Sequence, residues 1–390
     1  MFINRQIARE IKEAAGQMPV ISITGPRQSG KTTLARALFP DYKYVNLEDI
    51  EQRDFALADP KGFLQTTGER AIIDEIQYVP ELFSYIQIRA DETDKKGIYI
   101  LTGSQNFLLR EKISQTLAGR VAIFNLLPLS VAELDEYGLV TDDPESLMHK
   151  GFYPRLYSSK INYSNWLNDY IQTYIERDVR QIVNVGDLNS FRQFIKVCAA
   201  RSGQLINLSE IGNDISVSYK TVKRWLSILE ASYIIFTVMP YYKNFNKRII
   251  KSSKIYFYDT GVACNLLNIR NPSDLSFHYL RGGIFEGFIL SEFKKYMLNH
   301  KIPGEIYFFR DSAGNEVDAI IEANGKFIPV EIKAGKTIKP EFFKGLLYLK
   351  NLLKLTELQD FVIYGGDTTQ KRANTTVYGW KNANKVLYQF

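Results

Sequence analysis

Cysteine is scarce in this sequence, which has two cysteines among its 390 residues. Cys198 and Cys264 each lie in an apolar stretch, with no second cysteine at a metal-binding spacing and no histidine close by. A disulfide framework and a cysteine-ligated metal site are therefore excluded, and we expect two buried core thiols.

Long apolar runs are also missing. No stretch of about 18 consecutive apolar residues occurs, so we expect no membrane-spanning helix. Charged side chains, including Arg5, Arg9 and Glu10, interrupt the segment from Met1 to Val20, which therefore lacks the apolar core of a secretion signal. Internal repeats and low-complexity segments are absent as well, which argues against a solenoid or a disordered tail. We expect a cytoplasmic protein that has no membrane partner.

The remaining composition is ordinary for a soluble globular protein, with 45% hydrophobic and 24% charged residues. The length predicts two or three domains. A net charge of +6 is compatible with binding to nucleic acid but does not by itself indicate it.

The hydrophobic pattern indicates an α/β fold. Residues 20–127 alternate short apolar runs with helix-like stretches, which is typical of a parallel sheet covered by helices on both faces. After Pro128 this rhythm is lost, and an amphipathic stretch covers residues 166–185. We predict a nucleotide-binding core, a helical lid or linker, a middle module and a C-terminal α/β domain, which cover residues 1–140, 141–189, 190–275 and 276–390.

A phosphate-binding loop is predicted where the first strand meets the first helix of this core. The sequence GPRQSGKT at residues 25–32 has the spacing G-x-x-x-x-G-K-[ST] in the required strand-to-helix context, and a chance glycine-rich turn is the alternative. Backbone N–H groups and the helix N-terminus would bind the phosphates of ATP, with Lys31 on the β- and γ-phosphates and Thr32 on Mg²⁺. The predicted nucleotide contacts are Gly25, Pro26, Arg27, Gln28, Ser29, Gly30, Lys31, Thr32 and Thr33.

Two further strands end in polar residues. The apolar run at residues 71–73 leads into Asp74 and Glu75. We expect Asp74 to bind Mg²⁺ and Glu75 to orient or deprotonate the attacking water, whereas the alternative is a solvated strand end. The strand at residues 98–101 leads into a turn in which Ser104 is a candidate sensor of the γ-phosphate, a plain turn being an equal alternative.

These motifs together resemble the AAA-type ATPases, and in particular a prokaryotic family with a GPRQSGKTT loop, a DE acidic strand and a TGSQ turn. The resemblance continues through residues 117–127. It implies that Arg120, before the fifth strand, is a finger arginine that completes the site of a neighbouring subunit, and hence a homo-oligomer. Many AAA-type proteins have asparagine at the sensor turn, where this chain has Thr102 and Ser104. Arg155 is the candidate lid arginine.

The middle module has a helix-turn-helix outline. A short helix is predicted from Asn207, capped by Ser209, and a second one covers residues 219–230, with an apolar face that includes Trp225. Two aromatic, β-branched strands follow and would form the wing of a winged-helix-like module, with positive charge between them that includes Lys243 and Lys254. The candidate DNA-binding residues are Lys220, Lys223, Arg224, Lys247, Arg248 and Lys251. The alternative is a solvated basic loop on a module that contacts proteins.

The C-terminal domain contains a predicted β-hairpin with Asn324 and Gly325 at its turn. This register places Asp318 opposite Glu331 and Glu316 opposite Lys333 on one face, unless a bulge at Pro329 shifts it. Facing carboxylates repel each other, so a divalent cation or Lys333 is expected between them.

These residues, together with Glu286 on the preceding helix, resemble the PD-(D/E)xK restriction-endonuclease-like family. The resemblance implies that Asp318 and Glu331 bind Mg²⁺, that Lys333 positions or activates water, and that Glu286 is an auxiliary ligand. The alternative is a polar sheet edge with a salt-bridged lysine.

Two functions follow from these predictions. The leading hypothesis is an oligomeric AAA-type ATPase that a winged-helix-like module couples to a nuclease-like domain acting on DNA. The rival is a nucleotide-driven switch or protein-remodelling ATPase whose C-terminal fold is a vestigial binding platform.

Overall fold

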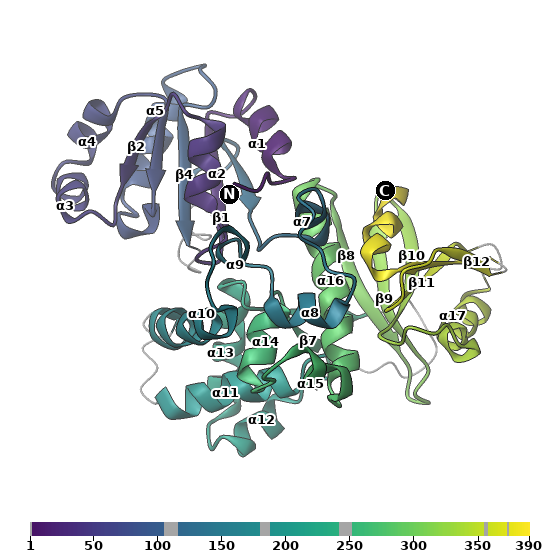
Figure 1. The fold of residues 1–390 in the computed structure, drawn as a ribbon. Helices are drawn as coiled ribbons and strands as arrows, with labels where there is room; N and C mark the ends of the chain where they lie inside the picture. Colours follow the sequence, from purple (N-terminus) through teal and green to yellow (C-terminus); the bar gives the residue numbers. More distant parts are fainter. Residues whose placement is uncertain (1, 105–115, 180–187, 242–251, 355–357, 373) are drawn as a thin grey trace.

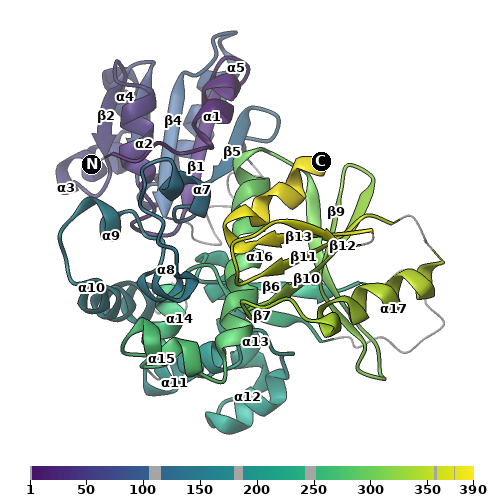
Figure 2. The same ribbon diagram turned by 45° about the vertical axis from the view of Figure 1, so that its right-hand side comes forward.

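The computed structural model describes residues 2–104, 116–179, 188–241, 252–354, 358–372 and 374–390. An N-terminal α/β unit stands beside a second body, which contains the middle helices and the C-terminal sheet (Figure 1). Figure 2 shows the long helix α16 (Arg281–Asn299) between that sheet and the middle helices. None of the described helices has the length and apolar character needed to cross a bilayer.

The N-terminal unit contains the predicted parallel sheet, with strand order β2-β3-β4-β1-β5. Its strands are β1 (Val20–Gly25), β2 (Lys43–Asn46), β3 (Ala71–Asp74), β4 (Tyr99–Ser104) and β5 (Val121–Asn125). Its helices are α1 (Ala8–Ala15), α2 (Lys31–Leu38), α3 (Ile50–Ala58), α4 (Pro60–Thr67), η1 (Ile76–Tyr78) and α5 (Leu82–Asp91). Helices α1 and α2 pack in one hydrophobic core and α3, α4 and α5 in another, so both faces of the sheet are covered.

Short helices follow the sheet and lead to the middle module. They are α7 (Val131–Asp135), α8 (Pro144–Lys150), α9 (Arg155–Ser158), α10 (Tyr163–Tyr170) and the π-type helix η2 (Ile171–Val179). The amphipathic stretch predicted over residues 166–185 thus begins within α10 and continues into η2, and its end lies outside the described residues.

The middle module has the predicted pair of helices, followed by two strands. Its elements are α11 (Leu188–Ala200), α12 (Leu208–Asp214), α13 (Tyr219–Ala231), β6 (Ile235–Pro240), β7 (Lys254–Phe257), α14 (Thr260–Leu266) and α15 (Pro272–Phe277). The prediction that Ser209 caps the first helix is wrong, because Asn207 has the extended backbone of a cap and its side chain accepts the N–H of Ser209. The apolar face of α13 is buried as predicted, with Trp225 against Phe191 and Phe194.

The C-terminal part is a sheet with a helix on each face. Its remaining elements are β8 (Gly304–Arg310), β9 (Glu316–Ala323), β10 (Lys326–Lys333), η3 (Pro340–Phe343), α17 (Lys344–Leu353), β11 (Asp360–Tyr364), β12 (Gln370–Arg372), β13 (Thr375–Gly379) and η4 (Trp380–Gln389). Helix α16 packs in the core on one face and α17 in the core on the other. The sheet continues through β6 and β7, because Met239 of β6 pairs with Tyr307 of β8. The sheet therefore contains strands from both sides of the predicted domain boundary between residues 275 and 276. That boundary stays a prediction.

The predicted hairpin register is confirmed from the pair Lys326–Ala323 to the pair Val330–Ala319. The predicted pairs Asp318–Glu331 and Glu316–Lys333 lie beyond this paired stretch and stay predictions. Ile328 pairs with Ile321 and Val330 with Ala319, so Pro329 introduces no shift. An irregularity lies instead between β8 and β9, at Tyr307. Beyond Val330, the N–H of Ile332 donates to Oδ2 of Asp318 at 2.8 Å.

Helix α16 also contacts the end of the N-terminal unit. Glu292 Oε2 accepts the backbone N–H of Val131 at 2.8 Å, and Lys295 Nζ donates to the carbonyl of Leu129 at 2.9 Å. Glu292 and Lys295 form a buried ion pair of 2.8 Å. The two bodies are therefore joined by buried polar contacts.

Candidate functional site

The predicted phosphate-binding loop lies between β1 and α2, as the motif requires. Gly25 has a φ of 151°, and a Cβ added there would lie 2.2 Å from the carbonyl oxygen of Leu126, so a larger residue does not fit. Gly30 has a φ of 93° at the start of the helix. Arg5 braces the loop, because its guanidinium donates to the carbonyls of Ser29 at 2.9 Å and Leu127 at 2.7 Å. Its Nε pairs with the buried Glu133 at 3.1 Å.

Lys31 is the first residue of α2 and is 5% exposed. Its ammonium group donates to the carbonyls of Gly25 at 3.1 Å and Pro26 at 2.8 Å, inside the loop. Burial lowers the pKa of Lys31 from 10.5 to about 8, against the opposing effect of the carboxylates of Glu75 and Asp74. In the protein without nucleotide, Lys31 therefore loses its proton more readily than an ordinary lysine does.

Asp74 at the end of β3 is held by three hydroxyl groups. Thr32 and Tyr44 donate to its Oδ2 at 2.9 and 2.8 Å, and Thr102 donates to its Oδ1. A threonine hydroxyl and a carboxylate side by side are the hard oxygen donors that Mg²⁺ prefers, so these residues fit the ion that the motif implies. Sequence reasoning identified Asp74 and Thr32 but missed Tyr44, which comes from the neighbouring edge strand.

Glu75 follows Asp74 in a left-handed conformation with a φ of 54°. Such a conformation is rare for a residue other than glycine and is often found at functional sites. Its Oε2 accepts the side-chain amide of Gln77, and the hydroxyl of Ser104 at 3.2 Å. Ser104, the candidate sensor, thus lies beside Glu75. Gln77 was not identified from the sequence.

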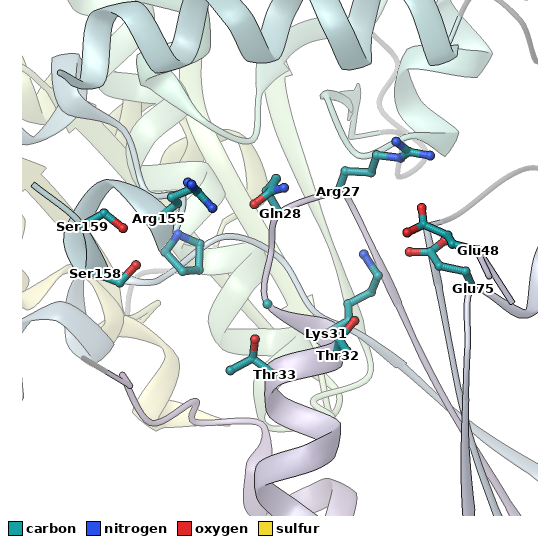
Figure 3. Close-up of a pocket in the computed structure, with 12 residues that line it drawn as sticks. Arg27, Gln28, Lys31, Thr32, Thr33, Glu48, Glu75, Arg155, Ser158 and Ser159 are labelled. Atoms are coloured by element: carbon teal, nitrogen blue, oxygen red, sulfur yellow. The ribbon is translucent and has the colours of Figure 1, made fainter. Parts of the chain in front are cut away.

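A cavity of about 390 Å³ joins these groups to the segment that follows the sheet. Figure 3 shows Arg27, Lys31 and Glu75 on one side of the loop and Arg155, Ser158 and Ser159 on the other. The cavity is lined by Arg27, Gln28, Gly30, Lys31, Thr32, Thr33, Glu48, Glu75, Pro154, Arg155, Ser158 and Ser159. The candidate lid arginine Arg155 therefore does line the predicted nucleotide site.

Aromatic side chains of α10 and η2 form a second wall beside the loop. The hydroxyl of Tyr170 donates to the carbonyl of Arg27 at 3.4 Å, and the Arg27 guanidinium lies 5.9 Å from the ring of Tyr174. Trp166 stacks on Tyr170 with ring centroids 5.2 Å apart. These residues were missed, although their i, i+4 spacing on one helix face was a usable signal.

Arg120 immediately precedes β5 and forms an ion pair with Asp91. Strands β1 and β5 are parallel, and Val20 lies opposite Val121. Arg120 therefore lies at the N-terminal end of these strands, whereas the phosphate-binding loop follows their C-terminal end. A strand of six residues extends about 20 Å at about 3.3 Å per residue, which is more than an arginine side chain can reach. Arg120 therefore does not contact a nucleotide bound in its own subunit.

The predicted DNA-binding residues are described in part. Lys220, Lys223 and Arg224 are exposed on α13, as expected from the burial of its opposite face. Lys243, Lys247, Arg248 and Lys251 lie outside the described residues. The prediction that Lys254 belongs to an exposed basic patch is wrong, because this lysine is 3% exposed and is paired with two carboxylates.

Asp318, Glu331 and Lys333 meet in one cluster, whereas Glu316, which was predicted opposite Lys333, pairs with Lys254 and Arg310. Lys333 Nζ lies 2.8 Å from Asp318 Oδ2 and 2.6 Å from Glu331 Oε1. Burial and the negative charge of Asp318 raise the pKa of Glu331 from 4.5 to about 8. Lys333 thus lies between the facing carboxylates, as the second of the two predicted alternatives, a divalent cation or Lys333, has it.

Glu286 of α16 belongs to the same cluster but binds a different lysine. Its Oε1 accepts the ammonium group of Lys254 at 2.8 Å and the hydroxyl of Tyr256. Burial raises the pKa of Glu286 from 4.5 to about 7, although Lys254 opposes this shift. The other partner of Lys254 is Glu316, which also pairs with Arg310. Across the described part of the chain, no group of three or more His, Cys, Asp or Glu side chains could hold a metal ion.

Comparison with known families divides the chain into three parts. Residues 17–135 match the AAA domain family. Residues 141–273 match a Domain of unknown function (DUF8612), and residues 281–382 match a Domain of unknown function (DUF4143). Neither description names a fold, so the winged-helix-like and restriction-endonuclease-like assignments stay predictions.

Similar sequences and solved structures were also found. The chain is 28% identical over 376 residues to Uncharacterized protein Rv2008c of Mycobacterium tuberculosis and to Uncharacterized protein Mb2031c of Mycobacterium bovis. Each of these alignments covers 96% of this chain and 82% of the relative. The walker-type ATPase PABY2304 of Pyrococcus abyssi has a TM-score of 0.45 and 16% identity, over 68% of this chain and 96% of that chain. The RuvB Holliday junction branch migration motor of Thermotoga maritima has a TM-score of 0.31 and 16% identity, over 60% of this chain and 90% of that chain.

Both TM-scores are below 0.5, so the assignment depends on the family match and on the phosphate-binding loop. On these grounds the chain contains an AAA-type ATPase domain.

Proposed function

We propose that this protein hydrolyses ATP with Mg²⁺ at the phosphate-binding loop and uses the energy to act on DNA. The observation that carries the proposal is the contact of 2.9 Å between Thr32 and Asp74, in the same site as Lys31 and Glu75. Hydroxyl, carboxylate, ammonium and a second carboxylate are the groups that phosphoryl transfer to water requires.

Each residue has a distinct role in this proposal. Thr32 and Asp74 would hold Mg²⁺, which neutralises charge on the β- and γ-phosphates. Lys31 binds the same phosphates after leaving the carbonyls of the loop. Glu75 orients the attacking water, and Ser104 fixes Glu75 in place and senses the γ-phosphate.

Arg120 is proposed to act in a neighbouring subunit. Its distance from the loop of its own chain excludes a role in cis, whereas its position at the start of β5 leaves it 34% exposed. A finger arginine supplied in trans stabilises the charge that develops during phosphoryl transfer. This proposal implies that the active form is a homo-oligomer.

DNA binding is proposed for the exposed basic side of α13. Lys220, Lys223 and Arg224 lie along one helix that follows α12 after a short turn, which suits contacts with a phosphate backbone. The proposal includes the four-part division of the chain. Its middle module is winged-helix-like and its C-terminal domain is restriction-endonuclease-like.

Metal-dependent DNA cleavage is the second candidate function, for the C-terminal domain. The observation that favours it is the meeting of Asp318, Glu331 and Lys333 at contact distance. The observation against it is the absence of a metal-holding group among the described residues. Cleavage that requires Mg²⁺ or Mn²⁺ and is lost in Asp318→Ala would establish it.

The experiment that tests the proposed function is an ATPase assay with purified protein. Turnover is measured without DNA and with single-stranded, double-stranded and branched DNA, using Lys31→Ala as the control for contaminating ATPases. Stimulation by DNA supports the proposal. Stimulation by a protein client alone favours the rival protein-remodelling function, and the absence of any ATP hydrolysis would refute both.

A further inference from the structure

Lys254 begins strand β7 and is one of the most deeply buried lysines in the described part of the chain, with 3% exposure. Its ammonium nitrogen lies 2.8 Å from Glu286 on α16 and 2.5 Å from Glu316 on β9. The ring of Phe308 lies 5.3 Å from the same nitrogen. Burying a lysine so completely is costly unless its charge is paired, so these contacts define its role.

The carboxylates around Lys254 and Lys333 form an acidic cluster that is paired with lysine and arginine side chains of the same chain. Its four carboxylates are those of Glu286, Glu316, Asp318 and Glu331, and its three cationic partners are Lys254, Arg310 and Lys333. Each carboxylate has at least one of these cations within 2.8 Å. A divalent ion that took the carboxylate oxygens held by these lysines would displace at least one lysine, whereas Oε2 of Glu331 is buried without a hydrogen-bond partner among the described residues.

Such displacement is unfavourable for a physical reason. A lysine that is covalently attached beside its partner carboxylates competes as an intramolecular ligand, with an effective concentration on the order of millimolar or higher. Lys254 is fixed further by its backbone, because it pairs with Val238 of β6 and forms a bridge with Leu205. An ammonium group neutralises negative charge but cannot act as a Lewis acid or generate hydroxide, as a metal ion does.

We propose that Lys254 and Lys333 permanently replace the divalent metal of the C-terminal acidic cluster. The cluster is then a metal-independent junction that joins β7 of the middle module to α16 and β9. This inference decides against metal-dependent DNA cleavage, the second candidate function above. The inference concerns the C-terminal domain and is independent of ATP hydrolysis at the phosphate-binding loop.

The first measurement is Mn²⁺ binding to the full-length protein, followed by electron paramagnetic resonance without nucleotide. All proteins carry Asp74→Asn to remove the predicted metal ligand at the ATP site. The proposal expects the number of bound Mn²⁺ ions to be the same with and without Asp318→Asn. A number that falls by about one ion per chain in the Asp318→Asn protein would overturn it.

The second measurement asks whether a metal can take the place of Lys254 when this lysine is removed. In the Lys254→Met protein the carboxylates of Glu286 and Glu316 lose their shared cation, so we expect a lower unfolding temperature in EDTA and a partial recovery in millimolar Mn²⁺. If the variant folds only when Mn²⁺ is present, that result is the same recovery in a stronger form. The wild-type unfolding temperature should not respond to Mn²⁺.

The matched control is Lys295→Met. Lys295 is equally buried on α16 but pairs with a single carboxylate, that of Glu292. This variant should also be destabilised, but Mn²⁺ should not restore it, because one carboxylate makes a poor metal site. The proposal is refuted if Lys254→Met shows no recovery in Mn²⁺, or if Mn²⁺ restores Lys295→Met equally well.

Discussion

Lys31 should couple ATP binding to the uptake of a proton. Its pKa of about 8 lies well below the ordinary 10.5, mainly because the ammonium group is buried. The difference corresponds to about 3 kcal/mol disfavouring the charged form, since one pKa unit is worth about 1.4 kcal/mol. Because Lys31 is 5% exposed, solvent does not screen this effect strongly. Negative phosphate oxygens beside Lys31 favour the charged form and will raise its pKa again.

The direction and size of the effect follow from this shift. A lysine with a lowered pKa is partly neutral in the free protein above about pH 8, and it must regain a proton when the phosphates bind. We therefore expect uptake of about 0.1 proton at pH 7, about 0.5 at pH 8 and about 0.9 at pH 9 per ATP bound. The affinity for ATP should fall about twofold at pH 8 and about tenfold at pH 9 relative to neutral pH.

Isothermal titration calorimetry measures this directly. The binding enthalpy is compared at each pH in two buffers with different ionisation enthalpies, and the difference gives the number of protons taken up. At pH 7 the terminal phosphate of ATP still carries a fraction of a proton that it releases on binding, so the uptake is read at pH 8 and pH 9, where the phosphates are ionised and contribute little. Lys31→Arg is the matched control, because arginine stays protonated and should show no uptake. An uptake near zero at pH 9 in the wild type, or an equal uptake in the control, would refute the reasoning.

Other predictions follow from the remaining site residues. Glu75→Gln should bind ATP with nearly unchanged affinity but hydrolyse it at least about 100-fold more slowly, measured by nucleotide binding and phosphate release, and full turnover would contradict its role. Arg120→Ala should also bind ATP but lose hydrolysis, and mixing it with Lys31→Ala subunits should partly restore activity, unless well-assembled mixtures stay inactive and so exclude action in trans. Replacing Lys223 and Arg224 with alanine should reduce the dependence of log Kd on log salt concentration by about 2, as measured by fluorescence anisotropy, and an unchanged slope would exclude α13 from the DNA interface.

The phosphate-binding loop was predictable because its chemistry is encoded by neighbours in the sequence. Gly25, Gly30 and Lys31 must occupy fixed places within one turn, and their spacing carries the geometry with it. The hairpin register was predictable for a similar reason, since a two-residue turn at Asn324 fixes every pair that follows.

The rest of the ATP site depends on contacts between distant segments. Tyr44 reaches Asp74 from an adjacent strand, and the aromatic residues around Tyr170 reach the loop from a helix that is 143 residues away from Arg27. The i, i+4 spacing of the aromatic residues indicates a shared helix face, but no local pattern specifies which distant segment that face contacts.

Lys254 shows why a pattern of charge is a weak predictor of exposure. In the sequence it continues a basic run, and a solvated surface was the natural interpretation. Its partner Glu286 is 32 residues away, and only the folded sheet brings the two together. A buried lysine and a surface lysine can have similar local sequences, and only their surroundings in the folded protein distinguish them.

The bracing of the loop by Arg5 has a mechanical consequence. Arg5 ties the loop to Glu133 in α7, and the backbone just before and at the start of α7 is held by Glu292 and Lys295 of α16. Helix α16 also carries Glu286, about 9 Å further along its axis at 1.5 Å per residue. The ATP loop and the C-terminal acidic cluster are therefore connected by a continuous series of buried polar contacts and by α16. Local opening at either end has to break buried polar contacts or travel along the helix, so nucleotide binding and the hydrogen exchange of α16 should change together.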